Sequence, residues 1–303
     1  MNRRRRVLPI VLGAVAVIIV AAFLLGRPAD DHVFFDGLPD DRPLVIAHRG
    51  GALLWPENTL VAFRGAVEIG SDVLEMDIYR TADNVPVVIH DPTVDRTTDG
   101  TGLVRSFTLE QLKRLDAGYR FIPAGAVTNP YRGEGVTIPT LREVFEVFPD
   151  EHMMVEIKEN DNEAADAVVS LVLEFNRADR TLLGSFHHDV LVRVRSTAPE
   201  IATHGSEKEL TVLLVKAWLR LDRAYSPAYE AVLVPQRSGP IPVTTRRFIG
   251  AARGRNLFVA PWTINDPDDM RMLLARGADG LITDRPDLAL EIVREDVARA
   301  RSH

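Results

Sequence analysis

The chain has 303 residues, of which 46% are hydrophobic and 26% charged, so it is long enough for one large α/β domain or two small ones. It has no cysteine, which excludes disulfides, thiolate metal sites and cysteine nucleophiles. Its net charge is −7, and without the first 27 residues, which hold five arginines and no acid, it is −12. This acidic body argues against nucleic acid as a partner, because phosphate backbones are bound by basic surfaces.

Residues 1–27 combine a basic stretch with an apolar run. Arg3–Arg6 precede the uncharged residues 7–26, which as a helix rising about 1.5 Å per residue would match the bilayer core of about 30 Å. The arginines before the run and Asp30 after it predict a single-pass membrane protein with a cytoplasmic N-terminus and an extracytoplasmic body. A cleaved signal peptide, which would make the protein secreted, is the alternative. We favour the anchor, because the run is long and ends in Phe23-Leu24-Leu25 without a small-residue cleavage site.

From Leu44 onward, short runs rich in β-branched residues alternate with helical patterns such as Glu57–Ile69 and Asp266–Arg276. Residues 28–42 are expected to be a linker and residues 43–303 one domain. The alternation predicts a parallel sheet, and eight units favour a TIM-type (β/α)8 barrel. A doubly wound open sheet is the rival, but no glycine-rich phosphate loop supports it. The predicted strands are Leu44–Ala47, Val73–Ile78, Met153–Ile157, Thr181–Ser185, Ile201–Thr203, Ala231–Val234, Leu257–Ala260 and Gly280–Ile282.

One interval between predicted strands is too long for a single helical crossover. Residues 79–138 contain turn sequences at Asp91-Pro92 and Thr98-Asp99-Gly100, and one short helical pattern near Leu109–Leu115. We interpret them as a small insertion after the second strand, at the carboxyl-terminal rim where barrel active sites are assembled.

Two neighbouring strands carry acids on one face. Within Val73–Ile78, Glu75 and Asp77 alternate with apolar residues and are expected to point into the barrel. Two confined carboxylates resist joint ionisation, and a hard cation such as calcium or magnesium relieves that penalty. Glu156 and Lys158 share a face of the next strand and point toward the same mouth. Arginine pairing of the acids and a buried Glu156–Lys158 ion pair are the alternatives.

Two histidines follow the ends of strands. His48 comes directly after Leu44–Ala47, and His90 comes after Val87–Ile89. Either one alone is more often structural than catalytic. Together they supply an acid and a base whose ordinary pKa of about 6.5 suits proton transfer at neutral pH. Arg49 can present a planar fork of donors to a phosphate.

These residues lie in a set of motifs that resembles the glycerophosphodiester phosphodiesterase family. The resemblance runs from about Pro43 to the C-terminus, in the family's order, and is specific as a set. The motifs are Ala47-His48-Arg49-Gly50, Pro56-Glu57-Asn58-Thr59, Leu74-Glu75-Met76-Asp77, Val88-Ile89-His90-Asp91-Pro92-Thr93, Asp95-Arg96-Thr97-Thr98-Asp99-Gly100, Ile138-Pro139-Thr140-Leu141, Glu156-Ile157-Lys158, Trp262-Thr263-Ile264-Asn265-Asp266 and Thr283-Asp284-Arg285-Pro286.

The resemblance implies a barrel with a small insertion and a divalent cation, commonly Ca²⁺ or Mg²⁺. It implies that His48 and His90 are the catalytic pair, and we expect His48 to be the base and His90 the acid. Trp262 would line the substrate pocket, with core packing as the alternative. The residues implied to bind the metal are Glu75, Asp77 and Glu156. Those implied to hold the phosphate are Arg49 and Lys158.

Two departures from the family pattern concern the shape of the pocket. The stretch Ala52-Leu53-Leu54-Trp55 is more apolar than in many relatives, and Pro261 is expected to interrupt the strand before Trp262. Asn58 and Thr59 stand where the first helix must be capped, and we favour capping over contact with the site.

The expected activity is metal-dependent hydrolysis of small-molecule glycerophosphodiesters to glycerol phosphate and an alcohol. The resemblance also allows a cyclic phosphate, formed by the substrate's own hydroxyl and opened by water. The apolar stretch Leu210–Leu221 suggests an alternative in which this segment contacts lipid and the enzyme accepts lysophospholipids. We favour the simpler interpretation, a helix with one buried face. The alternatives are a phospholipase C-like phosphodiesterase and a catalytically silent, membrane-tethered binding protein. The intact set of histidines and carboxylates argues against the silent protein.

Overall fold

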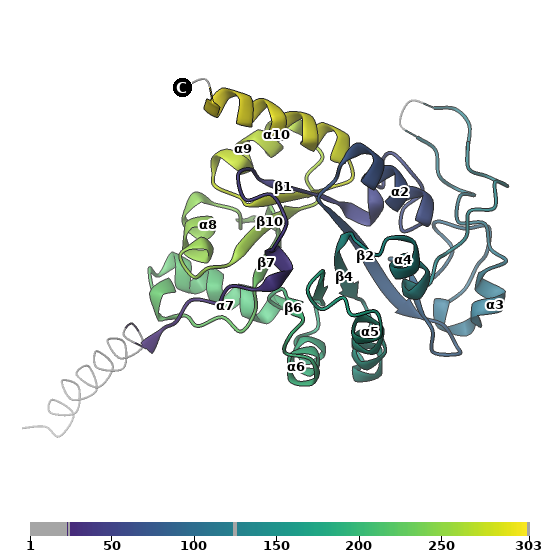
Figure 1. Cartoon of the computed structure of the whole chain (residues 1–303), viewed down its shortest axis with the longest axis horizontal. Coiled ribbons are helices and arrows are strands. Elements are labelled where there is room, and N and C mark those ends of the chain that lie inside the picture. The colour runs from purple at the N-terminus through teal and green to yellow at the C-terminus, as the bar shows by residue number, and fades with distance from the viewer. Residues whose placement is uncertain (1–22, 24, 124–125, 302–303) are drawn as a thin grey trace, which may run out of the picture.

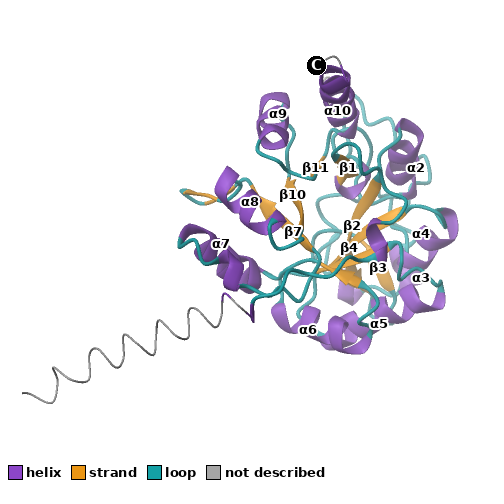
Figure 2. Ribbon diagram, turned by 60° about the vertical axis from the view of Figure 1, so that its left-hand side comes forward, coloured by secondary structure: helices purple, strands orange, loops and turns teal. Residues whose placement is uncertain are grey.

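The structure is a computed structural model that describes residues 23, 25–123 and 126–301. Its centre is a barrel of parallel strands with helices around it (Figure 2). The predicted TIM-type barrel is confirmed, and among the described residues each of its eight strands matches a predicted strand to within two residues at either end. The barrel strands are β1 (Leu44–Ala47), β2 (Val73–Arg80), β4 (His152–Ile157), β5 (Thr181–Gly184), β6 (Ala202–Thr203), β7 (Ala231–Pro235), β10 (Phe258–Trp262) and β11 (Gly280–Thr283).

The strands follow one another around the barrel in chain order. One ladder runs β11-β1-β2-β4-β5-β6, and β7 pairs with β10 in a second. A parallel bridge between His204 and Ala231 joins β6 to β7. A backbone hydrogen bond of 3.0 Å from Ile264 N to Ile282 O joins the end of β10 to β11. The ring is therefore closed, which excludes the open-sheet alternative.

Helices cover the outside of the barrel (Figure 1). Outward strand residues such as Leu74 and Met76 pack beneath them, whereas Ile46, Met154 and Ile282 belong to a separate cluster that fills the interior. The helices are α2 (Leu60–Ile69), α4 (Leu141–Val147), α5 (Asn162–Glu174), α6 (His188–Thr197), α7 (Glu207–Trp218), α8 (Arg246–Arg253), α9 (Pro267–Ala275) and α10 (Pro286–Arg301).

Side-chain caps set where several of these helices begin. Thr140 caps α4 and Ser206 caps α7, each in a capping box with a glutamate three residues later. Asp266 caps α9, and Pro267 occupies its first turn, where a missing N–H costs nothing. Gly70 ends α2 with a φ of 90°, a left-handed conformation that favours glycine. Local sequence therefore sets where these helices begin and, for α2, where the helix ends.

The predicted insertion forms a lobe beside the second strand. β3 (Pro86–Val88) pairs antiparallel with β2, and α3 (Leu109–Leu112) matches the short helix expected there. The lobe has its own apolar cluster, which includes Val94, Val104 and Leu112. It holds His90 just past the end of β3, at the carboxyl-terminal rim of the barrel.

The segment 28–42, expected to be a linker, contributes to the barrel core. It contains the short 3₁₀ helix η1 (Val33–Phe35), in which Phe34 is fully buried. The Phe34 ring packs edge-to-face on His152, the first residue of β4, with ring centroids 5.5 Å apart. Phe34 thus closes the amino-terminal end of the barrel, opposite the rim.

Pro261 lies inside β10 without interrupting it, contrary to the expectation from the sequence. β10 stays in register with β7 as far as the pair Trp262 and Pro235. Phe258 N donates to Glu230 O on the β7 side. Because alternate residues of a parallel strand bond to opposite neighbours, the nitrogen of Pro261 faces the edge toward β11, away from this ladder.

The predicted membrane anchor falls on residues that lie almost wholly outside the described part of the chain. Among the helices that are described, none combines the length and the apolarity needed to cross a bilayer. The anchor stays a prediction.

Candidate active site

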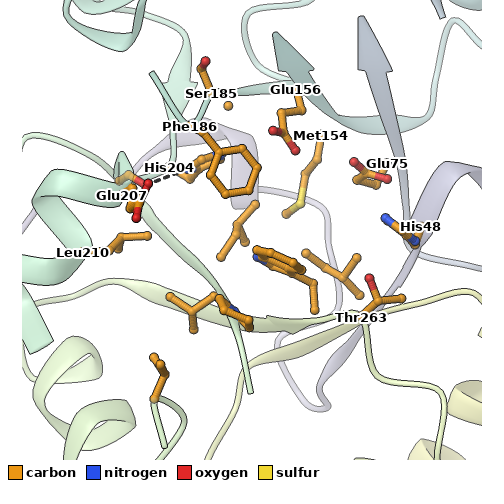
Figure 3. Close-up of a pocket in the computed structure, with 18 of the residues that line it drawn as sticks. His48, Glu75, Met154, Glu156, Ser185, Phe186, His204, Glu207, Leu210 and Thr263 are labelled. Atoms are coloured by element: carbon orange, nitrogen blue, oxygen red, sulfur yellow. Dashed lines mark hydrogen bonds between the residues drawn. The ribbon is translucent and has the colours of Figure 1, made fainter. Parts of the chain in front are cut away.

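The residues proposed from the sequence gather at the carboxyl-terminal ends of the barrel strands, around a cavity of about 610 Å³. Figure 3 shows the acidic residues Glu75 and Glu156 near His48, with Phe186 and Leu210 farther along the cavity. Asp77 lies beside the other two acids and is almost fully buried. The other residues predicted from the sequence that line the cavity are Arg49, His90, Lys158 and Trp262.

The three acids converge because of strand register. β2 and β4 are parallel, with Asp77 opposite Glu156, and Glu75 lies two residues earlier on the same face of β2. One oxygen from each of the three carboxylates lies within 4.8 Å of the others. Burial, reinforced by the charge of Asp77, raises the pKa of Glu75 to about 7. Burial also raises the pKa of Glu156, although Lys158 opposes the shift.

Two cations adjoin this cluster. Lys158 Nζ lies 2.8 Å from Asp77 Oδ1 and 3.1 Å from Glu156 Oε2, and Arg49 Nε lies 3.2 Å from Asp77 Oδ2. Burial disfavours the charged form of Asp77, but Lys158 and Arg49 outweigh it and lower the pKa of that carboxyl to about 2. Burial likewise disfavours the charged Lys158 side chain, but Asp77 and Glu156 raise its pKa. Both cations therefore stay charged beside the acids.

The acid cluster fits a hard divalent cation. Its donors are carboxylate oxygens, which calcium and magnesium prefer. Glu156 Oε1 is buried and has no hydrogen-bond partner among the described residues. A buried polar atom without a partner is costly unless a group outside the protein satisfies it. A cation would also let Glu75 ionise beside Asp77.

His48 is oriented by a carboxylate from the far end of the chain. Its Nδ1 lies 2.6 Å from Asp284 Oδ1, just after β11. Asn265 Nδ2 donates to the other oxygen of Asp284 at 2.7 Å. Nδ1 therefore carries the proton and Nε2 is left for the cavity. Burial opposes protonation of His48, but Glu75 and Asp284 outweigh it and raise the pKa of the imidazole.

His90 is held by a second network, which crosses from the insertion to the barrel. Its Nδ1 lies 2.6 Å from Asp91 Oδ1, and Arg96 Nε donates to the other Asp91 oxygen at 2.6 Å. Arg96 also makes two hydrogen bonds to Glu57, which accepts a third from Arg49. Burial lowers the pKa of His90. The negative charge of Asp77 acts in the opposite direction but offsets the effect of burial only in part.

The turn after β1 is tight, and this aims His48 and Arg49. Arg49 has a φ of 52°, in the left-handed region, and two glycines follow it. A Cβ atom on Gly50 would lie 2.7 Å from the Cβ of Ala62 on α2, so the turn packs directly on that helix. The sequence His48-Arg49-Gly50-Gly51 is thus required by backbone geometry as well as by chemistry.

The expectation that Asn58 caps a helix is wrong. Thr59 alone makes the side-chain cap of α2, by accepting from Ala62 N. Asn58 adopts a φ of 57°, and its Nδ2 donates to Asp77 Oδ2 at 2.9 Å. It therefore contacts the acid cluster directly.

Several other site residues had no role in the sequence prediction. Glu57, Asp91, Asn265 and Asp284 all stand in the recognised motifs, which was the available signal. The lining residue His204 stands outside them, and no sequence pattern distinguishes it.

Trp262 lines the pocket, as expected from the resemblance, and begins an apolar wall. Its ring packs edge-to-face against Phe186, with centroids 5.9 Å apart. The cavity consequently has a charged end at the strand termini and an apolar end toward α7. The other apolar lining residues toward that end are Leu210, Leu214, Leu233, Pro235, Ile241 and Val243.

Fold and site together define a class of protein. Paired imidazoles with fixed tautomers can transfer protons to and from oxygen atoms, and the cations beside them can neutralise an anionic ester. These parts sit at the rim where TIM-barrel enzymes carry their active sites. The chain is a phosphoric diester hydrolase built on such a barrel.

Comparison with known proteins identifies the family. Residues 48–288 match the glycerophosphoryl diester phosphodiesterase family. A glycerophosphodiester phosphodiesterase of Caldanaerobacter subterraneus subsp. tengcongensis is 36% identical over 268 residues, which cover 84% of this chain and 99% of that protein. The chain belongs to the glycerophosphoryl diester phosphodiesterase family.

Solved structures agree with this assignment. A phosphodiesterase of Oleispira antarctica, in complex with its product sn-glycerol-3-phosphate, has a TM-score of 0.68 and 27% identity. The match covers 84% of this chain and 97% of that one. A protein of Silicibacter pomeroyi, at 23% identity, has the same fold, with a TM-score of 0.72 over 88% of this chain and 99% of that one.

Proposed function

We propose that the protein hydrolyses glycerophosphodiesters to glycerol phosphate and an alcohol, with Ca²⁺ or Mg²⁺ held by Glu75, Asp77 and Glu156. The observation that carries the proposal is the convergence of these three acids with two carboxylate-held histidines in one cavity. A phospholipase C-like enzyme and a silent binding protein are less well supported. A metal-independent phospholipase C-like site would not need three convergent carboxylates, and a silent protein would not need the intact set of two histidines and three acids that this chain has.

Each charged group has a defined task in this proposal. Arg49 and Lys158 bind the phosphodiester oxygens and neutralise the negative charge that grows at phosphorus. When bound, the cation supplies further positive charge at the same place. His48 removes the proton from the substrate's own neighbouring hydroxyl as that oxygen bonds to phosphorus. His90 gives a proton to the departing alcohol oxygen as the phosphorus–oxygen bond breaks, which leaves a cyclic phosphate. In the second step His90 takes a proton from water as the water oxygen bonds to phosphorus, and His48 returns its proton to the ring oxygen that leaves, which yields glycerol phosphate.

The proposal is tested by an assay of glycerophosphocholine hydrolysis with calcium, magnesium or excess chelator in parallel. We expect activity with at least one cation and none with chelator. We expect His90→Ala to lose nearly all turnover, of the order of a hundredfold or more, while keeping its melting temperature. Full turnover in chelator would exclude the cation's role, and full turnover of His90→Ala would exclude that of the histidine.

A change of leaving group tests which of the two histidines is the base and which is the acid. A p-nitrophenyl diester departs without needing a proton, because p-nitrophenolate is a weak base. If His90 is the acid, His90→Ala should cleave this substrate much better than glycerophosphocholine, relative to wild type, whereas His48→Ala should cleave both poorly. The reverse pattern would exchange the two roles.

We also propose that residues 7–26 anchor the protein in a membrane, with the catalytic domain on the extracytoplasmic side. The basic residues before the run and its length support this. Protease added to intact cells should digest the catalytic domain, and the mature protein should keep its N-terminus. A mature N-terminus beyond Ala22 would instead indicate a secreted enzyme.

Lysophospholipids are a second proposed substrate class. The apolar end of the cavity, with Trp262, Phe186 and Leu214 along it, supports this because it offers hydrocarbon contact to an acyl chain. Leu214→Asn should raise KM for lysophosphatidylcholine several-fold and leave KM for glycerophosphocholine unchanged. Equal effects on both substrates would remove the support.

A further inference from the structure

Helix α7 is apolar on two opposite faces. Leu213 and Ala217 are fully buried in the core beneath it, and Leu210 and Leu214 line the cavity. Glu209, one of the polar residues of α7, has its partners inside the protein: it accepts hydrogen bonds from the Arg195 guanidinium and from the backbone N–H of Ser206. Packing and site therefore explain the inner face of the helix but not the opposite one.

The outer face of α7 and the residue after it form an exposed apolar surface, which we call the outer stripe. Its members recur at spacings of three and four residues, so they lie along one side of the helix. Solvent-facing positions of a barrel helix are ordinarily polar, and contiguous apolar surface marks a contact site. The stripe consists of Val212, Val215, Trp218 and Leu219, which are 41%, 43%, 49% and 62% exposed.

The chain that precedes the folded body arrives near the C-terminal end of α7. Arg27 N donates to Ser226 Oγ at 3.0 Å, eight residues beyond the end of α7, and Ala29 packs in the same apolar cluster as Leu213. In Figure 1 the purple start of the described chain runs alongside α7. In the sequence, Arg27 follows the apolar residues 7–26 directly.

Exposed cations surround the stripe. Lys208 lies one turn before Val212, and Arg220 and Arg223 follow Leu219. Basic residues beside an apolar face attract anionic lipid headgroups, and tryptophan is favoured at the boundary between headgroups and hydrocarbon. A protein partner or a second copy of the chain would need neither the cationic border nor the approach of an apolar segment.

We propose that the outer stripe lies on the surface of a lipid bilayer, with Trp218 at the level of the acyl-chain boundary. Docking of the outer stripe goes beyond the proposed function. It rests on one part of that proposal, the membrane anchor, which brings the bilayer within reach of the stripe. The opposite face of the same helix lines the cavity, so about one helix diameter, roughly 10 Å, separates the apolar end of the cavity from the membrane surface. Docking would thus hold the cavity close to the bilayer from which a lipid-derived diester comes.

Fluorescence of Trp218 in the full-length protein tests this directly. The protein is reconstituted in vesicles of phosphatidylcholine and phosphatidylglycerol, with and without bromine on the acyl chains, which quenches nearby tryptophans. Trp218 is one of three tryptophans, so bromine should remove up to roughly one third of the emission. In Trp218→Phe this loss should disappear. Equal quenching of both proteins would overturn the proposal.

A second variant separates docking from simple tethering. Val215→Asp with Leu219→Asp keeps Trp218 but charges the stripe, and it should abolish the bromine quenching. The matched control is Leu173→Asp, a 40% exposed residue of α5 on another side of the barrel, and it should leave the quenching unchanged. Both variants should hydrolyse soluble glycerophosphocholine at the wild-type rate, although the quenching needs no activity. Protection of Trp218 from both bromine and aqueous acrylamide would indicate a protein partner and overturn the proposal.

Discussion

At the scale of single residues, the two histidines proposed as catalytic are held in the same way. Each has Nδ1 at 2.6 Å from an aspartate oxygen, and the other oxygen of that aspartate accepts from Asn265 or Arg96. Each carboxylate fixes the tautomer that directs Nε2 toward the substrate. The aspartates are positioning residues, because they act through the imidazoles.

Asp284→Asn should lower kcat by about a hundredfold or more, because an amide no longer selects the required tautomer of His48. KM should change little. Steady-state kinetics on glycerophosphocholine check this, with Asp287→Asn as the matched control, since the carboxylate of Asp287 pairs with Arg285 rather than with a histidine. Wild-type kcat in Asp284→Asn would show that the contact does not position the base.

His204 should make the folded state sensitive to acid. Burial lowers the pKa of His204 to about 4, and its Nδ1 donates to Gly205 O. The unfolded chain binds this proton at a pKa of about 6.5. The free energy of unfolding should therefore be highest above this pH and fall as pH drops toward 4, by up to about 3 kcal/mol. Urea unfolding at several pH values checks this, because His204→Asn should lack that component of the slope.

Sequence reasoning succeeds at this scale where chemistry follows a local period. Strand alternation alone turns Glu75 and Asp77 to the inside. It cannot pair His48 with Asp284, because the two residues are 236 positions apart and only the closed barrel brings them together. Asn58 was misjudged because its contact with Asp77 depends on a left-handed backbone, which competes with its ordinary preference for a helix cap.

At the scale of elements, the insertion is fastened to the barrel where His90 stands. The guanidinium of Arg96 joins Asp91 to Glu57, so it links the rim loop to the segment that begins α2. The Arg96 side chain is half exposed, so its ion pairs should add little to the free energy of unfolding. Its effect should lie in geometry, because a small displacement of a catalytic group is costly.

Arg96→Ala should lower kcat on the order of tenfold while changing the melting temperature little. Kinetics and thermal unfolding, measured together, check this. Arg105→Ala is the control, because Arg105 is a half-exposed arginine of the same insertion that pairs with Glu159, away from His90. A large loss of stability in Arg96→Ala with unchanged kcat would mean that the tie is structural.

Elements were the most predictable part of the fold. β-Branched runs gave all eight barrel strands, because buried parallel strands are short and nearly all apolar. The effect of Pro261 was misjudged, because its direction in the ladder depends on which neighbour forms hydrogen bonds with β10. For α7, the buried inner face favoured from the sequence is present. The sequence also raised lipid contact for this stretch, but only the packed structure shows which apolar residues stay exposed together on the opposite face.

At the scale of the whole molecule, a bound cation should stabilise the fold. Glu75, Asp77 and Glu156 come from β2 and β4, and their mutual repulsion in a buried place opposes closure of the barrel. A ligand at a hundred times its Kd adds about 2.7 kcal/mol to the free energy of unfolding. Calcium or magnesium should thus raise the melting temperature by several degrees.

Differential scanning fluorimetry checks this prediction without any assay of turnover. Glu156→Gln should lose most of the cation-induced shift. Glu174→Gln, at a surface pair with Arg142, should keep it. An identical shift in wild type and Glu156→Gln would place the cation elsewhere.

The contact between His48 and Asp284 also ties activity to the order of synthesis. β1 leaves the ribosome early and β11 nearly last, yet the two strands are neighbours in the ring and each supplies one partner of the contact. A nascent or prematurely terminated polypeptide has its base without the group that orients it. With His48 in the proposed role of base, hydrolysis begins only when the ring is complete, and truncated products would be inert rather than partly active.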